Sequence, residues 1–253
     1  MTGIMIVARL GSTRLTQKHL IEAAGKTFIE WLAERYIFAF RKEIKLGEAV
    51  VFIATSPNEE NKKFETVFAN NPAVKIFYGA DSNIPLRQWQ CAAANDINEI
   101  ISIDGDDILC STEAAILVKN KLLRHCDYVK TSGLALGMNV MGYKTSFLKS
   151  SLDKAQTNTL ETGWGRIFNE EKAENIALGN YDLDRRLRLT LDYSEDAQFF
   201  KKVIEGLQEK LFKTNDASLI DYIIQNKYYQ LNEKVNDIYW RNFEQQKKAE
   251  TKS

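Results

Sequence analysis

The chain has 253 residues, of which 44% are hydrophobic and 11% aromatic. This apolar content is sufficient for an ordinary packed core, and the length suits one large α/β domain or a domain with a sizeable insertion. Lys plus Arg and Asp plus Glu are equal at 34 each, so no net field favours nucleic acid or an anionic membrane as a partner. Any phosphate group must therefore be bound by a local cluster of positive charge.

The cysteines and the N-terminal residues indicate in which cellular compartment the protein is expected. Cys91, Cys110 and Cys126 are far apart and form no Cys-x-x-Cys pair, which is typical of free thiols in a reducing compartment. No cationic segment followed by an apolar run begins the chain, and no apolar stretch is long enough to cross a bilayer. These features predict a cytoplasmic protein.

Apolar runs alternate with helical patterns along the first half of the chain. Runs typical of strands buried on both faces cover residues 3–8, 49–55, 74–78, 99–103 and 127–131. Between them, apolar residues at helical spacing and capping signals predict helices over 28–40, 57–70, 86–95 and 111–124. Intervals this short fit only βαβ units, so the sequence predicts a mainly parallel sheet with helices on both faces.

The pattern is less regular after residue 131. We interpret residues 133–182 as a middle insertion that carries substrate or dimer contacts. Within it, a strand is expected over 139–143 and a helix over 161–170.

Regular patterns return toward the C-terminus. A strand is predicted over 188–192, ending in an acidic residue, and a helix over 194–207. Residues 217–252 are expected to be helical with a solvated, charged face. The predicted organisation is therefore a domain over 1–215 followed by a C-terminal helical tail over 216–253.

A cationic loop (residues 9–18) follows the first strand, at the end of the sheet where α/β proteins bind ligands. Its sequence, Arg-Leu-Gly-Ser-Thr-Arg-Leu-Thr-Gln-Lys, combines arginines, a lysine, hydroxyls and a glycine. A triphosphate needs free N–H groups, hydroxyl donors, and cations that neutralise a leaving pyrophosphate. The loop lacks the P-loop pattern Gly-x₄-Gly-Lys-[Ser/Thr]. By composition alone, a solvated basic turn is an equally good interpretation.

An acidic loop (residues 104–107, Asp-Gly-Asp-Asp) follows the fourth strand. Carboxylates at a strand end can hold Mg²⁺, which takes few protein ligands and completes its shell with water and phosphate oxygens. The Asp104-Gly105-Asp106 triplet would equally suit a metal-dependent glycosyltransferase, and a tight surface turn is the structural alternative. The preceding apolar strand favours a metal site, with Asp192 as a candidate partner of Asp106 across the cleft.

Three motifs, in this order, carry a resemblance to a known family. Residues 8–20 resemble the pattern Ala-Arg-x-x-Ser-x-Arg-Leu-Pro-x-Lys-x-Leu, residues 103–107 a strand-end Gly-Asp motif, and residues 188–196 the pattern Arg-x-Thr-x-Asp-Tyr-Pro-Glu-Asp. All three are similar to motifs of the cytidylyltransferase family, which includes the CMP-3-deoxy-manno-octulosonate and CMP-acylneuraminate synthetases and the spore-coat polysaccharide biosynthesis protein F group. Departures from the patterns leave every charged group in place. They are Thr16, Ile108 and Ser194 in place of prolines, and an added carboxylate at Asp104.

The resemblance implies a three-layer nucleotidyltransferase sandwich, GT-A-like and Rossmann-like, usually assembled as a homodimer. It implies that Arg9, Lys18 and Asp106 are catalytic and that Asp106 and Asp192 hold Mg²⁺. The nucleotide-binding residues that it implies are Ala8, Arg9, Gly11, Ser12, Lys18, Asp81 and Arg87. The candidates for substrate contacts are Asp104, Arg188 and Trp164.

Three aromatic or titratable residues, His19, Trp164 and Trp240, also have structural interpretations. His19 lies beside Lys18 and could touch phosphate, although a packing or surface role is expected. Trp164, between two glycines, could line a sugar pocket or pack at an interface. Trp240 follows a helical apolar pattern and is expected in the core.

The function implied is transfer of CMP from CTP, or of a nucleotide from another triphosphate, to an acidic sugar or sugar phosphate. Pyrophosphate would be released, and the product would serve polysaccharide or glycoconjugate biosynthesis. Two alternatives stay open: a glycosyltransferase that uses Asp104 and Asp106, and a nucleotide-binding relative without catalytic activity.

Overall fold

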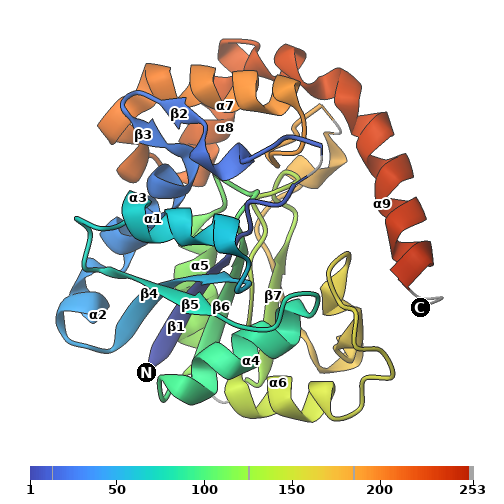
Figure 1. The fold of residues 1–253 in the computed structure, drawn as a ribbon. Helices are drawn as coiled ribbons and strands as arrows, with labels where there is room; N and C mark the ends of the chain where they lie inside the picture. The colour runs from blue at the N-terminus through green and yellow to red at the C-terminus, as the bar shows by residue number, and fades with distance from the viewer. Residues whose placement is uncertain (13, 125, 185, 251–253) are drawn as a thin grey trace.

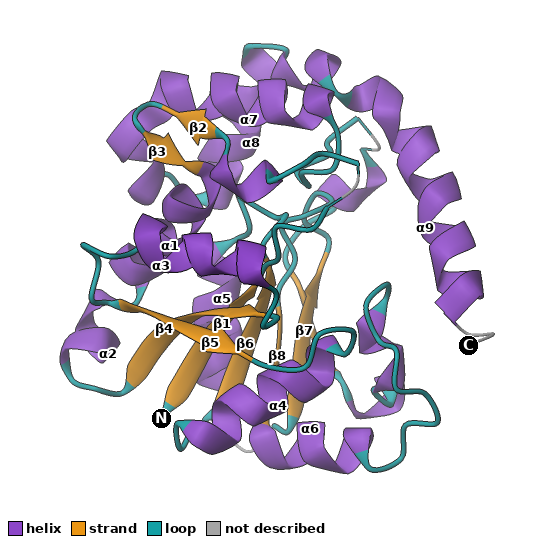
Figure 2. Cartoon of the chain, viewed as in Figure 1, coloured by secondary structure: helices purple, strands orange, loops and turns teal. Residues whose placement is uncertain are grey.

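The computed structural model describes residues 1–12, 14–124, 126–184 and 186–250, except for the side chains of Lys247 and Glu250. Within these residues a seven-stranded sheet has the order β5-β4-β1-β6-β8-β7-β9. Helices cover both of its faces, and the N-terminal strand lies near its middle (Figures 1 and 2). The strands are β1 (Thr2–Val7), β4 (Ala49–Thr55), β5 (Val74–Tyr78), β6 (Glu99–Asp104), β7 (Tyr128–Ser132), β8 (Met141–Lys144) and β9 (Glu174–Ala177). A small hairpin pairs β2 (Glu22–Ala23) with β3 (Lys26–Thr27).

The strand directions confirm the predicted architecture. β5, β4, β1 and β6 are parallel neighbours, β7 is parallel to β9, and β8 runs antiparallel to both β6 and β7. The helices are α1 (Phe28–Ala39), α2 (Arg41–Lys45), α3 (Lys63–Val67), α4 (Ile84–Ala94), α5 (Thr112–Leu122), α6 (Thr145–Leu152), α7 (Ser194–Leu207), α8 (Asp216–Gln225) and α9 (Asn236–Glu250). The fold is therefore a three-layer α/β sandwich with a mainly parallel sheet.

Alternating residues of β1 supply two separate cores. Ile4 and Ile6 pack into the core beneath α1, α5 and α7, and Met5 packs into the core beneath α4 and α6. All three side chains are fully buried. Successive side chains of a strand point to opposite faces, so a strand covered on both sides must be apolar throughout. This is why the sequence shows uninterrupted apolar runs here.

Two of the elements expected after residue 160 are wrong. Residues 161–170 form no α-helix, only short 3₁₀ turns at Trp164–Ile167 and Glu170–Lys172. Two glycines lower helix propensity there, and Gly163 has a φ of 58°. Residues 188–192 form no regular strand, and only Arg188 joins β-structure, through an isolated bridge to Leu136.

The middle region and the C-terminal segment are also more closely integrated than expected. β8 and β9, both within the predicted insertion, are strands of the central sheet, and α6 was not expected. The helix expected over 217–252 is interrupted between α8 and α9 by short 3₁₀ turns, and Lys227 has a φ of 55°. α8 packs into the main core through Leu219, Ile220 and Ile223. Trp240 of α9 is 46% exposed, so its expected place in the core is wrong.

None of the helices in the described residues combines the length and the apolar composition needed to cross a membrane.

Candidate active site

The three sequence motifs meet at the carboxyl ends of β1 and β6. Gly105 N–H donates to the Val7 carbonyl at 2.8 Å, and Leu191 N–H donates to the Asp106 carbonyl at 2.9 Å. A Cβ on residue 105 would lie 2.7 Å from the Val7 carbonyl oxygen. Glycine is therefore required at this position, because the acidic loop packs directly against the backbone of β1.

A cavity of about 930 Å³ opens above this junction. It is lined by most of the residues that the motifs singled out: Ala8, Arg9, Gly11, Ser12, Lys18, Arg87, Asp104, Asp106, Trp164 and Asp192. Two of the predicted site residues, Asp81 and Arg188, do not line it.

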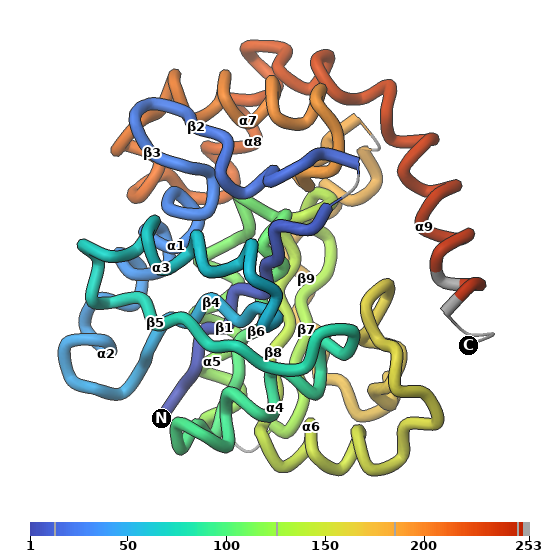
Figure 3. The backbone as a smooth tube through the Cα atoms, in the orientation of Figure 1, coloured from blue at the N-terminus to red at the C-terminus, as the bar shows by residue number. Residues whose placement is uncertain are grey.

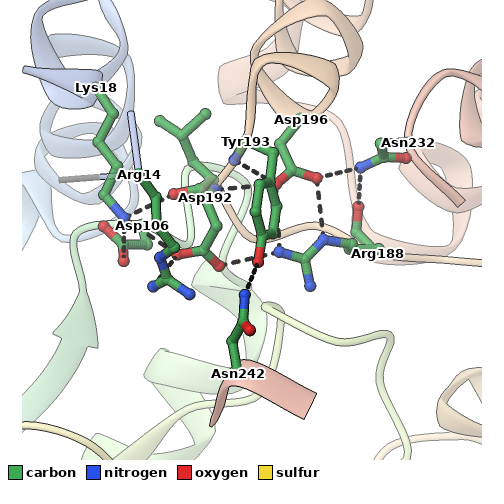
Figure 4. A network of polar contacts seen from close by, with 10 residues as sticks. Arg14, Lys18, Asp106, Arg188, Asp192, Tyr193, Asp196, Asn232 and Asn242 are labelled. Atoms are coloured by element: carbon green, nitrogen blue, oxygen red, sulfur yellow. Dashed lines mark hydrogen bonds and ion pairs between the residues drawn. The ribbon is translucent and has the colours of Figure 1, made fainter. Parts of the chain in front are cut away.

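Lys18 joins the cationic and acidic segments inside the cavity. Its Nζ lies 2.6 Å from Asp106 Oδ2 and 3.4 Å from Asp192 Oδ1, and donates to the Leu191 carbonyl at 2.8 Å (Figure 4). Burial by itself lowers the pKa of Lys18, but attraction to Asp106 and Asp192 outweighs burial and raises the pKa above its usual value. Lys18 is therefore a fixed positive charge between two carboxylates.

The carboxyl groups of the acidic loop differ in their ease of ionisation. Burial acts to raise the pKa of Asp106, but the positive charge of Lys18 outweighs burial and lowers the pKa below its usual value. The pKa of Asp104 is raised to about 6, mainly because its hydration is restricted and to a smaller extent because Asp106 repels its charge. Burial and repulsion from Asp104 raise the pKa of Asp107 well above the usual range. Asp106 is thus the ionised group of the loop, and its neighbours bind protons more readily.

Asp192 is held in place by a buried ionic network. Arg188 NH2 lies 2.9 Å from Asp192 Oδ2, and Arg188 Nε lies 3.0 Å from Asp196 Oδ1 (Figure 4). Asn232 Nδ2 donates to the same Asp196 oxygen at 2.9 Å. The Asp192 and Tyr193 N–H groups donate to Asp196 Oδ2, which closes the start of α7. Arg188 therefore lies behind Asp192, fully buried, rather than in the cavity wall where a substrate contact was expected.

Two further arginines face the cavity. Arg14 NH2 lies 2.8 Å from Asp192 Oδ1. The guanidinium of Arg9 forms a bidentate ion pair with Glu161, with N–O distances of 2.5 and 2.7 Å. Arg9 is thus held by a carboxylate from the middle region, in the geometry that a phosphate would also accept.

Arg87 and Asp81 contribute to the loop after β5. Arg87 is buried, and its guanidinium donates to the carbonyls of Ala80 at 2.8 Å and Asp81 at 2.5 Å. Burial lowers the pKa of Arg87 to about 10. The exposed side chain of Asp81 instead accepts a hydrogen bond from Asn58 at 3.1 Å. Asp81 is therefore not among the residues that line the cavity.

Trp164 and His19 line the cavity, and each contacts a carboxyl group of the acidic loop. Trp164 is 6% exposed, and its side chain hydrogen-bonds to Asp104. This bond lowers the pKa of Asp104, but the larger effect of restricted hydration raises it. His19 is buried with Nε2 3.4 Å from Asp106 Oδ1, and burial lowers its pKa to about 4. His19 is therefore uncharged at neutral pH and supports the Asp106 carboxylate from below the cationic loop.

Several cavity residues were not predicted to be functional. Arg14 and His19 belong to the first motif, so their positions in the sequence could have indicated them. Glu161 and the residues of α9 that line the cavity, among them Tyr239 and Phe243, carry no motif. Their contribution arises only from the packing of the middle region and the C-terminal helix around the motifs.

Asp106 and Asp192 form a donor pair suited to one type of metal. Both carboxylates lie within 3.4 Å of the same cationic group, Lys18 Nζ, and so converge on one point of the cavity. The described residues contain no group of three or more His, Cys, Asp and Glu side chains arranged for a metal. Two carboxylates that line the same cavity fit Mg²⁺, which takes its other ligands from water and phosphate.

Known proteins are similar to this chain in sequence and in structure. The family model described as cytidylyltransferase matches residues 4–235. No match was found among curated proteins. A cytidylyltransferase from Leptospira borgpetersenii serovar Hardjo-bovis is similar in structure, with 23% identity, coverage of 91% of this chain and 97% of the other, and a TM-score of 0.77.

Two other solved structures share the fold at lower similarity. One is CMP:2-keto-3-deoxy-manno-octonic acid synthetase complexed with CTP, with 13% identity, coverage of 81% and 98%, and a TM-score of 0.57. The other is 4-diphosphocytidyl-2C-methyl-D-erythritol synthase from Anaerococcus prevotii, with 13% identity, coverage of 81% and 96%, and a TM-score of 0.53. At these identities the likeness shows a common nucleotidyltransferase fold.

Proposed function

The chain belongs to the cytidylyltransferase family, whose model matches residues 4–235, and on this premise we propose that it is a CMP-sugar synthetase. It transfers CMP from CTP to an acidic sugar and releases pyrophosphate. The observation that carries the proposal is the convergence of Lys18, Asp106 and Asp192 on one point of the cavity. The neighbour complexed with CTP, a synthetase that acts on a keto-deoxy sugar acid, supports both the nucleotide and the class of acceptor.

The proposed reaction is one displacement at phosphorus. A sugar oxygen forms a bond to the α-phosphorus of CTP, the bond to the bridging oxygen of the β-phosphate breaks, and pyrophosphate leaves with that electron pair. The proton of the sugar hydroxyl passes to solvent. Mg²⁺, when bound by Asp106 and Asp192, neutralises and orients the reacting phosphates. Lys18 contacts Asp106, and Arg188 contacts Asp192, so both carboxylates that would hold the ion are fixed by ion pairs.

The cations of the cavity act on the charge that develops during transfer. Lys18 is buried and fixed by three oxygen contacts, so its charge is in place before the substrate arrives. Arg9 and Arg14 are more exposed and can move from their carboxylate partners to phosphate oxygens. Catalysis by this arrangement depends on positioning and electrostatic stabilisation of the leaving pyrophosphate.

The proposal is tested by measuring pyrophosphate release from CTP and Mg²⁺ with a panel of acceptors. The panel contains 2-keto-3-deoxy-manno-octonic acid, N-acetylneuraminic acid, glucose 1-phosphate and glycerol 3-phosphate. We expect a sugar acid to support release, and Asp106→Asn to lower the rate at least about 100-fold. Asp81→Asn is the matched control, because Asp81 is exposed and lies outside the cavity wall.

The outcomes separate the alternatives. Tight CTP binding without pyrophosphate from any acceptor would point to a non-catalytic relative. Transfer from a nucleotide sugar, with no reaction of CTP, would point to a glycosyltransferase that uses Asp104 and Asp106. A normal rate in Asp106→Asn would remove this carboxylate from the reaction.

The proposal includes a cytoplasmic homodimer, on the basis of the family resemblance. Light scattering on the purified chain tests the assembly, with a single species of twice the chain mass as the expected result.

A further inference from the structure

The C-terminal helix α9 forms one wall of the cavity, although its sequence suggested only a solvated tail. Tyr239, Phe243, Gln246 and Ala249 line the cavity at spacings of three and four residues, which places them on one face of the helix. Figure 3 shows α9 at the edge of the molecule, with the loop that precedes η3 (Trp164–Ile167) on its inner side. A Cβ on Gly163 of that loop would lie 3.5 Å from the Phe243 ring.

The first half of α9 is connected to the segment that carries Asp192. The Tyr239 ring centroid lies 4.2 Å from Arg188 Cζ, and Arg188 binds Asp192. Asn242 Nδ2 donates to the Tyr193 hydroxyl at 2.9 Å (Figure 4). α9 is therefore positioned against the carboxylate side of the site rather than against the loop after β5.

The chemistry of this wall differs from that of the cationic loop. The described side chains of α9 that line the cavity are two aromatic rings, an amide and a methyl group, and none is charged. Such a surface gives a phosphate nothing to pair with. It suits the C–H face of a saturated ring, which packs against the negative face of an aromatic ring, and the Gln246 amide can bond to hydroxyls.

The geometry of the proposed displacement indicates which substrate contacts the α9 wall. In an in-line displacement the attacking and leaving oxygens lie on opposite sides of the phosphorus. The cationic loop supplies Arg9, Arg14 and Lys18 to the cavity and takes the leaving pyrophosphate, whereas none of the described α9 side chains in the cavity wall is charged. The acceptor therefore enters on the side of α9. We propose that α9 forms the acceptor subsite and that Phe243 and Gln246 select a polyhydroxylated ring as the acceptor. This inference rests on the proposed transfer of CMP.

The test compares Phe243→Ala and Gln246→Ala with the unmodified chain, with Ile238→Ala as the control because Ile238 is an exposed residue of α9 outside the cavity wall. Rates of pyrophosphate release are measured against the acceptor of the panel that reacts best, and the affinity for Mg²⁺ and CTP is measured by calorimetry. We expect the KM for the acceptor to rise about fivefold or more in Phe243→Ala, with nucleotide affinity unchanged. Gln246→Ala should shift the KM in the same direction without changing the apolar wall.

Each other outcome overturns the inference. If Phe243→Ala weakens CTP binding instead, α9 contacts the nucleotide. If the acceptor KM stays normal in both variants while the unmodified chain turns over, the acceptor binds elsewhere and the proposed function stands. If no acceptor of the panel reacts with the unmodified chain, the proposed function fails and the inference fails with it. Equal melting temperatures of the variants and the Ile238→Ala control exclude misfolding as the cause of a change.

Discussion

Lys18 Nζ lies 3.4 Å from Asp192 Oδ1, although the two residues are 174 positions apart in the chain. The same ammonium lies 2.6 Å from Asp106 Oδ2, so it links the loops at the ends of β1 and β6 to the segment before α7. Each of these segments reaches the site from a different part of the sheet or from outside it. The contact is therefore a property of the whole fold, and several consequences can be measured.

Replacing Lys18 should affect both catalysis and stability. In Lys18→Met the leaving pyrophosphate loses a fixed cation, and we expect the rate of release to fall at least about 100-fold. The buried carboxylate of Asp192 and the part-buried one of Asp106 lose a partner, so the free energy of unfolding in urea should fall by roughly 3 kcal/mol. Lys63→Met, at an exposed position of α3, is the control. Loss of stability with a normal rate would show that Lys18 is only structural.

Arg188 should contribute more to stability than a surface arginine nearby. It is fully buried between Asp192 and Asp196, and Arg188→Ala removes the cation that pairs with buried Asp196 and one of the cations that pair with buried Asp192. We expect a decrease of about 3–5 kcal/mol in the free energy of unfolding. Arg186→Ala removes an exposed ion pair with Asp184 and should change it by less than about 1 kcal/mol. Equal losses in urea melts of the two variants would contradict the importance of burial.

Glu161 should compete with the nucleotide for Arg9. The bidentate pair occupies both terminal nitrogens of Arg9, which cannot bind phosphate oxygens in the same geometry at the same time. Glu161→Gln weakens this pair, so the affinity for CTP with Mg²⁺ should rise, by up to about fivefold in calorimetry. Glu59→Gln, which weakens an exposed pair with Lys62, should leave the affinity unchanged. Weaker binding in Glu161→Gln would mean that Glu161 itself holds the substrate.

Asp216 should reduce stability at neutral pH. Burial raises its pKa above the usual value, against a smaller opposite effect of the hydrogen bond from Ser111. For a carboxyl group whose folded-state pKa is raised, stability falls as pH rises from the unfolded pKa through the folded pKa. Asp216→Asn keeps the hydrogen bond and removes this loss. Its melting temperature should therefore exceed that of the unmodified chain at pH 7, and the difference should shrink as the pH is lowered toward 4. A difference independent of pH would point to packing instead.

The central strands were predictable because burial on both faces of the sheet requires an uninterrupted run of apolar residues. Residues 49–55 and 74–78 were expected as strands and are β4 and β5 with those bounds. The helix over 194–207 is α7, whose acidic first turn and strong apolar periodicity marked it. By contrast, 161–170 has apolar residues and acids at helical spacing, but its glycines favour turns.

The candidate site was predictable in part. Motif order indicated that Lys18, Asp106 and Asp192 share a site, and the structure brings them together. It could not indicate that Arg188 acts from behind Asp192, or that Glu161 binds Arg9 from 152 positions away. These ion pairs depend on how the loops pack against one another. The same carboxylate would be exposed to solvent if its loop packed differently.

The sequence by itself therefore determined the parallel sheet, the two polar loops at its carboxyl edge, and the residue types that can hold a triphosphate and Mg²⁺. Local patterns suffice for these, because strand periodicity and loop chemistry depend on neighbouring residues. Only the tertiary structure decided that Lys18 is buried between two carboxylates, that Asp81 lies outside the cavity, and that an uncharged face of α9 closes one side of it. These features depend on distances between segments far apart in the chain, which are set by the packing of the whole fold.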